Sequence, residues 1–156
     1  MLDKDMKAII VQANLSFVAT VNKDGSPNLS PKSTLRVYDD SHLIFANLCS
    51  PGTIANLKRD PRIEINCIDI FSRRGYRFTG TADVHSPGDT LYEEFDATMK
   101  QELGPATKVH DAVLVTLAEV NPILSPAYSN PKVTEEGLRK TYLKRYGVAA
   151  KMEPAS

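Results

Sequence analysis

The sequence predicts a mainly β protein of the α+β class, in which about six mostly antiparallel strands close into one barrel with flanking helices. Its 156 residues suffice for one domain with a buried core. Hydrophobic residues make up 42% and charged residues 24% of the chain, which is typical of a folded globular protein. Short β-rich stretches follow one another across tight turns, as in antiparallel hairpins. Closure into a barrel removes the exposed edges of such a sheet.

The first fifty residues predict one helix and three strands. Apolar side chains recur at helical spacing over residues 3–13. Residues 16–21 are β-rich, and the turn that follows ends at Gly25, which adopts a positive φ easily. The return strand is expected over residues 28–37 and the third strand over residues 42–46.

The return strand is expected to present two different faces, because side chains alternate along a strand. Pro31 predicts an edge position or a bulge, since proline cannot donate to a ladder. One predicted face carries Leu29, Ser33, Leu35 and Val37, and the other carries Ser30, Lys32, Thr34 and Arg36.

The remainder of the chain predicts three further strands and three helices. The second helix is expected to start at Ser50, with Pro51 at its first helical position, and to end at Asp60–Pro61. Ser86 is predicted to cap a third helix, again with a proline next to it. We expect strands over residues 62–70, 75–85 and 112–120, and a final helix that carries Leu138, Tyr142 and Tyr146.

We expect a single domain over residues 1–150 and a frayed tail over residues 151–156. Charged residues interrupt the apolar residues of the N-terminus, which argues against a signal peptide. No segment approaches the ~20 apolar residues of a membrane span. The two cysteines and three scattered histidines predict neither disulfides nor a metal site. Together these features predict a cytoplasmic protein.

The 19 basic and 19 acidic residues balance, so no overall field attracts nucleic acid or an anionic membrane. A bound anion must therefore contact a local group of cations and hydrogen-bond donors. The sequence contains no Gly-x-Gly-x-x-Gly or P-loop motif, and the scattered histidines supply no base for a nucleophilic triad.

Two neighbouring segments combine features of an anion site. Lys32 lies among serine and threonine hydroxyls on the predicted return strand, and such groups contact phosphates. The segment from Ser50 to Asn56 opens a helix, whose N-terminal N–H groups attract anions. Each segment also has an ordinary explanation, a solvated strand face for the first and a plain helix cap for the second. The intervening turn can place the two segments side by side.

Three arginines within five residues form the third feature, Arg73, Arg74 and Arg77. Arginines of this kind contact a ligand phosphate, a carboxylate or a partner subunit. Interleaved aromatic residues also permit nucleic-acid binding, although the balanced net charge argues against it. A solvent-exposed loop and strand edge is the remaining interpretation.

Three segments, taken in order, resemble the pyridoxamine 5'-phosphate oxidase-like family of FMN-binding proteins. They are FVATVNKDGSPNLSPKSTLRV from residue 17, LIFANLCSPGTIANLKRDPRIEIN from residue 43, and RRGYRFTGTADV from residue 73. The resemblance covers roughly residues 5–127. It implies a six-stranded antiparallel split β-barrel with flanking helices, which forms a homodimer and binds FMN between its subunits.

The same resemblance implies which residues form the site. The ribityl phosphate would be held by the return strand and the following helix start, and the flavin ring would lie beside the third strand. The partner subunit would contribute the stretch around Arg74 to Arg77. The implied cofactor contacts are Lys32, Ser33, Thr34, Ala46, Asn47, Ser50, Thr53, Asn56, Arg74 and Arg77.

The activity implied by the resemblance is an FMN-dependent oxidoreductase that transfers hydride or electrons to a small-molecule substrate. The chain departs from the family in having no tryptophan, and in placing Pro51–Gly52 where a basic pair is often seen. These departures argue against pyridoxamine 5'-phosphate as the substrate. The alternative is a non-catalytic flavin, haem or deazaflavin binding protein or sensor on the same fold.

Overall fold

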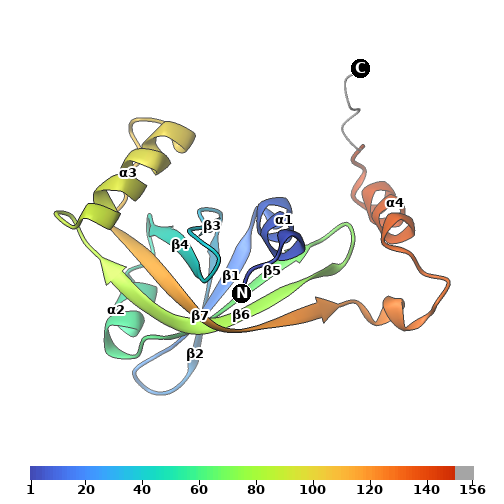
Figure 1. The fold of residues 1–156 in the computed structure, drawn as a ribbon, viewed down its shortest axis with the longest axis horizontal. Coiled ribbons are helices and arrows are strands. Elements are labelled where there is room, and N and C mark those ends of the chain that lie inside the picture. Colours follow the sequence, from blue (N-terminus) through green and yellow to red (C-terminus); the bar gives the residue numbers. More distant parts are fainter. Residues whose placement is uncertain (150–156) are drawn as a thin grey trace.

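A computed structural model describes residues 1–149 as one curled antiparallel sheet with flanking helices (Figure 1). Seven strands in this part of the chain follow the order β2-β1-β5-β6-β7-β4-β3. The predicted tail over residues 151–156 lies outside the described residues. The elements are α1 (Lys4–Ala13), β1 (Ser16–Val21), β2 (Pro27–Lys32), β3 (Arg36–Val37), β4 (His42–Asn47), α2 (Pro51–Arg59), β5 (Arg62–Asp69), β6 (Arg74–His85), α3 (Thr90–Leu103), β7 (Asp111–Leu124), the 3-10 helix η1 (Pro126–Ser129) and α4 (Glu135–Tyr146).

The prediction of six strands is wrong by one, because the return strand expected over residues 28–37 is divided. Its first part is β2, which pairs with β1, and its second part is β3, which pairs with β4. The two parts lie in different ladders, so Lys32 and Arg36 do not share one strand face. Arg36 instead pairs with Glu102 of α3 at 2.5 Å.

The short link between β2 and β3 shows why the sheet must curl. These strands are the two opposite edges of the sheet. In a flat seven-stranded sheet the edges would stand about 29 Å apart. The four Cα steps from Lys32 to Arg36 reach at most about 15 Å. The sheet therefore bends into a half-barrel, and we call the gap between β2 and the β3–β4 pair the seam.

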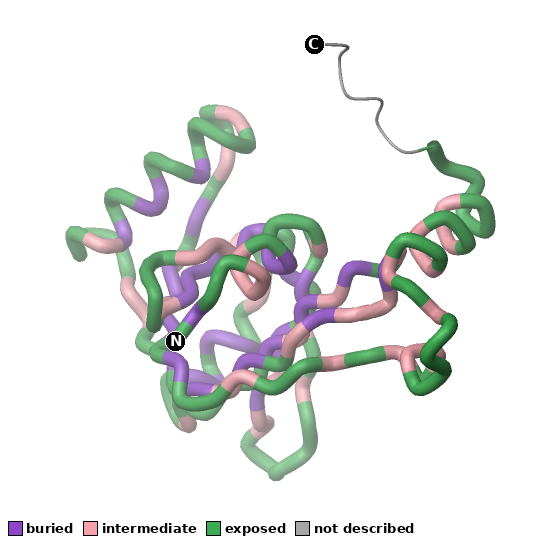
Figure 2. The backbone as a smooth tube through the Cα atoms, turned by 45° about the vertical axis from the view of Figure 1, so that its right-hand side comes forward, coloured by how far each residue is buried: buried purple, intermediate pink, exposed green. Residues whose placement is uncertain are grey.

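The inner face of the curled sheet carries the main hydrophobic core, and buried residues concentrate there (Figure 2). Helix α1 packs against β5 and β6 through Ile9 and Ile10. The predictions of this helix and of the strands over residues 16–21, 42–46, 62–70 and 75–85 are confirmed to within about a residue at most ends. Fully buried side chains of the sheet include Val18, Phe45, Ile65, Phe78 and Val113.

One glycine on β6 is required by the close approach of its neighbour β7. A Cβ added at Gly80 would lie 2.1 Å from the carbonyl oxygen of Thr116. The register of the β6–β7 ladder shifts between Thr79 and Gly80. This irregularity helps the longest ladder of the sheet to bend.

Two boundaries differ from the sequence prediction. Helix α3 is capped by Asp89, whose side chain accepts from the Leu91 N–H at 2.9 Å, and not by Ser86. Gly88 has a φ of 98°, which no helical residue adopts, so the helix cannot begin earlier. Strand β7 continues beyond the expected residue 120 to Leu124, because its last residues pair with the start of β6.

The segment after β7 projects from the barrel as an arm formed by η1 and α4 (Figures 1 and 2). Helix α4 contains the predicted Leu138, Tyr142 and Tyr146, and it has no buried residue. Its contacts to the barrel are therefore those of a docked helix and not of a core element. None of the helices in residues 1–149 combines the length and the apolar character needed to cross a bilayer.

Candidate functional site

A group of polar side chains fills the seam where α2 packs against β1 and β2. Side chains at alternate positions of β2 point to one side of the sheet, and three of them are polar here. They meet the first turns of α2, which follows β4 on the other side of the seam. We call this group the seam cluster: Thr20, Asn28, Ser30, Lys32, Ser50, Thr53 and Asn56.

Lys32 is the only charged member of the seam cluster, and it is only 6% exposed. Its Nζ donates to Ser30 Oγ at 2.6 Å and to Ser50 Oγ at 2.5 Å. Within residues 1–149 no carboxylate pairs with this ammonium group. Burial therefore lowers the pKa of Lys32, and the nearby Cys49 offsets this in part. Lys32 is a desolvated cation whose partners are neutral.

The N-terminus of α2 lies beside this cation. Ser50 occupies the N-cap position, but its hydroxyl accepts from Lys32 and makes no capping bond to the helix. Pro51 has no N–H, and the N–H groups of Gly52 and Thr53 have no acceptor in the described part of the chain. The positive end of the helix dipole thus adds to the charge of Lys32.

The remaining members hold α2 in place. Asn28 Nδ2 donates to Thr53 Oγ1 at 3.3 Å and to Thr20 Oγ1 at 3.1 Å. Asn56 Nδ2 donates to Thr20 Oγ1 at 3.1 Å and to Asn22 Oδ1 at 2.9 Å. The amide of Asn56 is thus occupied within the protein, whereas the Thr53 hydroxyl accepts one bond and keeps its own hydrogen for another partner.

The other predicted residues of the strand segments lie around the seam cluster. The Thr34 hydroxyl bonds the backbone of Ala46, donating to its carbonyl at 3.3 Å and accepting from its N–H at 3.0 Å. Ser33 is exposed. Asn47 contacts the cluster, because its Oδ1 accepts from the Ser50 N–H at 2.8 Å.

Hollows open on both sides of the seam cluster. One of about 430 Å³ is lined by Lys32 and Ser33 together with the end of α1. Another of about 530 Å³ is lined by Asn47, Ser50 and Asp111 together with one side of α2 from Pro51 to Lys58. A ligand that enters either hollow reaches the N-terminus of α2 or the stem of Lys32.

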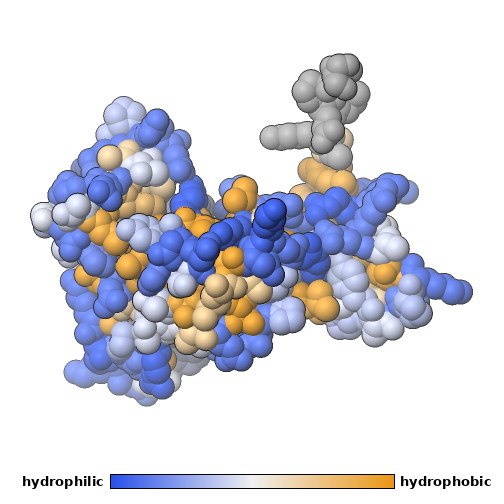
Figure 3. Space-filling model, in the orientation of Figure 1, coloured by the Kyte–Doolittle hydropathy of each residue, from blue (hydrophilic) through white to orange (hydrophobic). Residues whose placement is uncertain are grey.

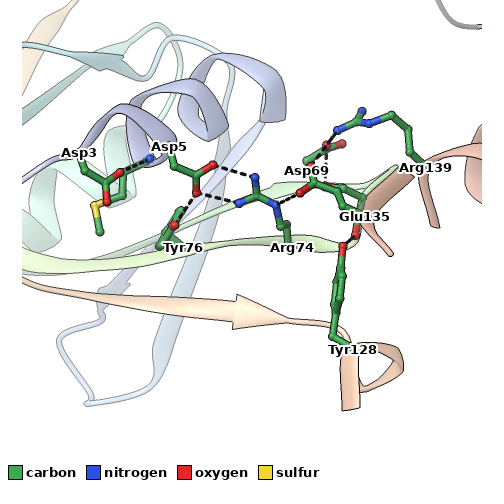
Figure 4. A network of polar contacts seen from close by, with 10 residues as sticks. Asp3, Asp5, Asp69, Arg74, Tyr76, Tyr128, Glu135 and Arg139 are labelled. Atoms are coloured by element: carbon green, nitrogen blue, oxygen red, sulfur yellow. Dashed lines mark hydrogen bonds and ion pairs between the residues drawn. The ribbon is translucent and has the colours of Figure 1, made fainter. Parts of the chain in front are cut away.

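Arg74 lies at the far end of the barrel, in an ionic network of its own (Figure 4). It donates to both oxygens of Asp5 at 2.8 Å and to Glu135 of the arm at 2.8 Å. Tyr76 also donates to Asp5, at 2.5 Å. Arg74 and Tyr76 lower the pKa of Asp5 to about 2, and this contact raises the pKa of Tyr76 to about 12. Each of the three nitrogens of the Arg74 guanidinium therefore donates to a carboxylate.

Two further contacts complete the attachment of the arm. Arg139 of α4 donates to Asp69 at 2.5 Å, and Tyr128 of η1 donates to the Ser72 carbonyl (Figure 4). Arg77, by contrast, is 49% exposed in its side chain, and its closest acid is Glu64 at 3.8 Å. Within one chain, neither Arg74 nor Arg77 joins the seam cluster.

The sequence patterns did not predict that three members of the seam cluster contact α2 or its N-cap residue or support these contacts. They are Thr20, Asn28 and Ser30. A signal for two of them was present, since polar residues recur at every second position from Asn28 to Lys32. It was obscured by the assumption that one strand continues to residue 37. No three metal-ligating side chains come together within residues 1–149.

Known proteins share this fold and part of this sequence. The uncharacterised protein MJ0282 of Methanocaldococcus jannaschii is 27% identical over 117 residues, which cover 70% of this chain and 73% of that protein. The crystal structure of a tagged HupZ from Group A Streptococcus is 28% identical with a TM-score of 0.71, covering 80% of this chain and 96% of that one. The structure of an FMN-binding protein from Syntrophomonas wolfei has a TM-score of 0.66 at 14% identity. The match covers 77% of this chain and 84% of that one, and it shows the fold alone.

The sequence profile of one family extends over the whole sheet. The profile described as pyridoxamine 5'-phosphate oxidase matches residues 2–123, from the start of the chain almost to the end of β7. The match includes every member of the seam cluster and leaves out the arm. This chain therefore belongs to the pyridoxamine 5'-phosphate oxidase family.

Proposed function

We propose that this protein binds FMN by its terminal phosphate at the seam cluster and uses the flavin for redox chemistry on a small-molecule substrate. One observation carries the proposal. The ammonium group of Lys32 is almost completely buried and hydrogen-bonded to hydroxyls and a backbone carbonyl, with no acid among its partners. A buried charge without a counter-charge is costly, and an anion beside it removes that cost.

The residues around Lys32 fit a phosphate group. The ammonium group supplies charge, and the free N–H groups of Gly52 and Thr53 supply directed donors at a helix N-terminus. The hydroxyls of Ser50 and Thr53 already accept bonds from the protein, so their hydrogens remain for phosphate oxygens. Ala46 and Asn47 border the same seam and would lie near the rest of the cofactor.

The flavin supplies the hydride or electron transfer, so this chain does not need an acid–base pair of its own. Support comes from the family to which the chain belongs and from the FMN-binding protein of Syntrophomonas wolfei, which has the same fold. The role of this chain is to hold the phosphate and to shield the ring from water.

We further propose that the protein is a homodimer. Phe17 and Leu29 are 42% and 64% exposed on the outer side of the β1–β2 hairpin, where they pair with Pro31 and Ala19. Apolar side chains also interrupt the hydrophilic surface of the barrel in the space-filling view (Figure 3). A second copy of the chain would cover such residues.

The partner's contribution to the flavin site is assigned to Arg77 in this proposal. Arg77 is half exposed and weakly paired, whereas Arg74 is held by two carboxylates.

We also propose a cytoplasmic location. Both cysteines are free thiols, as is common for proteins of a reducing compartment such as the cytoplasm.

The test is the visible spectrum of the purified protein, combined with mass spectrometry of the released ligand. We expect flavin absorption bands, FMN as the released molecule, and bleaching of the bands by NADH or NADPH. If the colour remains in the presence of both reductants, the protein binds flavin but does not accept electrons from NADH or NADPH, which would contradict the redox part of the proposal. A Soret band or a colourless protein that does not take up added FMN would contradict the proposal.

A further inference from the structure

A series of hydrogen bonds, in which Ser50 takes part with both its hydroxyl and its backbone N–H, links Lys32 to an acid on the opposite side of the seam. Lys32 Nζ donates to Ser50 Oγ at 2.5 Å, and the Ser50 N–H donates to Asn47 Oδ1 at 2.8 Å. Asn47 Nδ2 then donates to Asp111 Oδ2 at 2.8 Å. The second oxygen, Asp111 Oδ1, accepts from Ser86 Oγ at 2.9 Å.

The carboxylate at the end of this chain fixes the orientation of the amide in its middle. An ionised carboxylate only accepts hydrogen bonds, so Asn47 must turn its NH₂ group toward Asp111. Its oxygen then faces the N–H of Ser50, the residue at the N-cap position of α2. Without Asp111, the Ser50 N–H alone would set the orientation of the Asn47 amide, and the Nδ2 group would lose its acceptor.

The backbone makes this arrangement rigid. Asn47 and Asp111 are direct partners in the β4–β7 ladder, and Asn47 is only 5% exposed. The His110 N–H also donates to the Asn47 carbonyl at 2.8 Å. The two hydrogen bonds of the Asn47 side chain, to Asp111 of β7 and to the Ser50 N–H, therefore hold the start of α2 in a fixed position relative to β7.

We propose that Asp111 is a positioning residue for the phosphate site: through Asn47 it fixes Ser50 and the N-terminus of α2 beside Lys32. This inference rests on the proposed FMN function. Asp111 has no direct hydrogen bond to Lys32 and contacts it only through Asn47 and Ser50. Asp111 also lines the hollow beside α2, where the negative charge of its carboxylate would repel a phosphate, so the contribution that we propose is orientation and not charge.

The test compares FMN with riboflavin, which lacks the phosphate, on three variants of the full chain. Asp111→Ala should weaken FMN binding about five- to tenfold, the equivalent of one lost hydrogen bond, and should leave riboflavin binding unchanged. Asp111→Asn keeps an oxygen that can face Asn47, so it should restore most of the FMN affinity. Asp83→Ala is the matched control, because Asp83 is an exposed acid on the neighbouring strand β6 without a side-chain partner in residues 1–149.

A general loss of stability would weaken both ligands together, so the ratio of the two affinities separates positioning from folding. If Asp111→Ala does not fold, Asn47→Ala breaks the same link and should give the same ratio. Equal retention of the FMN preference in both variants would overturn the inference. Absence of any FMN preference in the unmodified protein would instead overturn the proposed function.

Discussion

Lys32 and Arg74 are two basic residues of one barrel in opposite surroundings. Lys32 is more deeply buried, yet its side-chain partners are the hydroxyls of Ser30 and Ser50. Arg74 is bound by two carboxylates, Asp5 and Glu135. The charge of the partners, and not burial alone, therefore distinguishes a basic residue that can bind an added anion from one that stabilises the fold.

The directions of the two pKa shifts express the same difference. Burial without a counter-charge lowers the pKa of Lys32, because the charged form is disfavoured. The neighbouring acids raise the pKa of Arg74 above its ordinary value. A bound anion would raise the pKa of Lys32 again, because it would supply the missing negative charge. At Arg74 the carboxylates of Asp5 and Glu135 already supply that charge.

The largest effect is expected for Lys32→Met, which removes the charge and keeps the apolar stem. FMN binding should weaken ten- to a hundredfold, about 1.5–3 kcal/mol for a lost charge-assisted contact, with little change for riboflavin. The flavin-free variant should be more stable by about 1 kcal/mol, because an uncompensated buried charge is gone. Flavin fluorescence titrations and thermal melting measure both. Equal losses for the two flavins would show that Lys32 does not contact the phosphate.

The second largest effect is expected for Arg74→Met, with the opposite pattern. The variant should lose about 1–2 kcal/mol of unfolding free energy, since Asp5 and Glu135 lose a shared partner at a partly exposed site. FMN affinity should change by no more than about twofold. Denaturant unfolding and FMN titration provide the readouts. A large fall in FMN affinity with unchanged stability would show that Arg74 belongs to the FMN site together with Lys32.

A smaller effect is expected for Asp5→Asn, and it should depend on pH. The pKa of Asp5 in the folded protein is lowered from 3.8 to about 2, so its contribution to stability is present above pH 3.8 and is lost as the pH falls toward 2. Because the side chain is 45% exposed, solvent screening limits this contribution to about 1 kcal/mol. Unfolding curves of both proteins should differ at neutral pH and converge as the pH approaches the lowered pKa. A difference that is constant with pH would contradict the assignment.

The smallest effect on stability is expected for Arg77→Ala, which should stay within about 0.5 kcal/mol of the unmodified protein. Its guanidinium is half exposed and 3.8 Å from Glu64. If Arg77 reaches the flavin of a partner, FMN binding should still weaken about fivefold, and Arg77→Lys should recover part of it. Sedimentation and FMN titration at several protein concentrations test this. No change in affinity at any concentration would remove Arg77 from the site.

Local sequence patterns were sufficient for most of the secondary structure. Alternation predicted β5 and β6, helical spacing predicted α1, and the proline after Ser50 placed the start of α2. The sequence also suggested that Lys32 lies near the α2 N-terminus, because a single hairpin between the two segments can place them side by side. The prediction that these segments meet is confirmed.

Pairing across long distances could not be predicted in this way. The return strand divides after Lys32 because its two halves find different partners, β1 and β4, and alternation within the segment does not reveal a change of ladder. Arg74 looks like a free cation in the sequence, yet its acids lie 69 and 61 residues away. The hydrogen bonds between the Thr34 hydroxyl and the backbone of Ala46 likewise depend on tertiary structure, so the sequence could not show that this hydroxyl already has a partner.

The most direct measurement is a paired titration of the unmodified protein with FMN and with riboflavin under the same conditions. A phosphate bound by Lys32 and the α2 N-terminus predicts at least about tenfold tighter binding of FMN. Equal affinities for the two flavins would mean that no phosphate site exists at the seam.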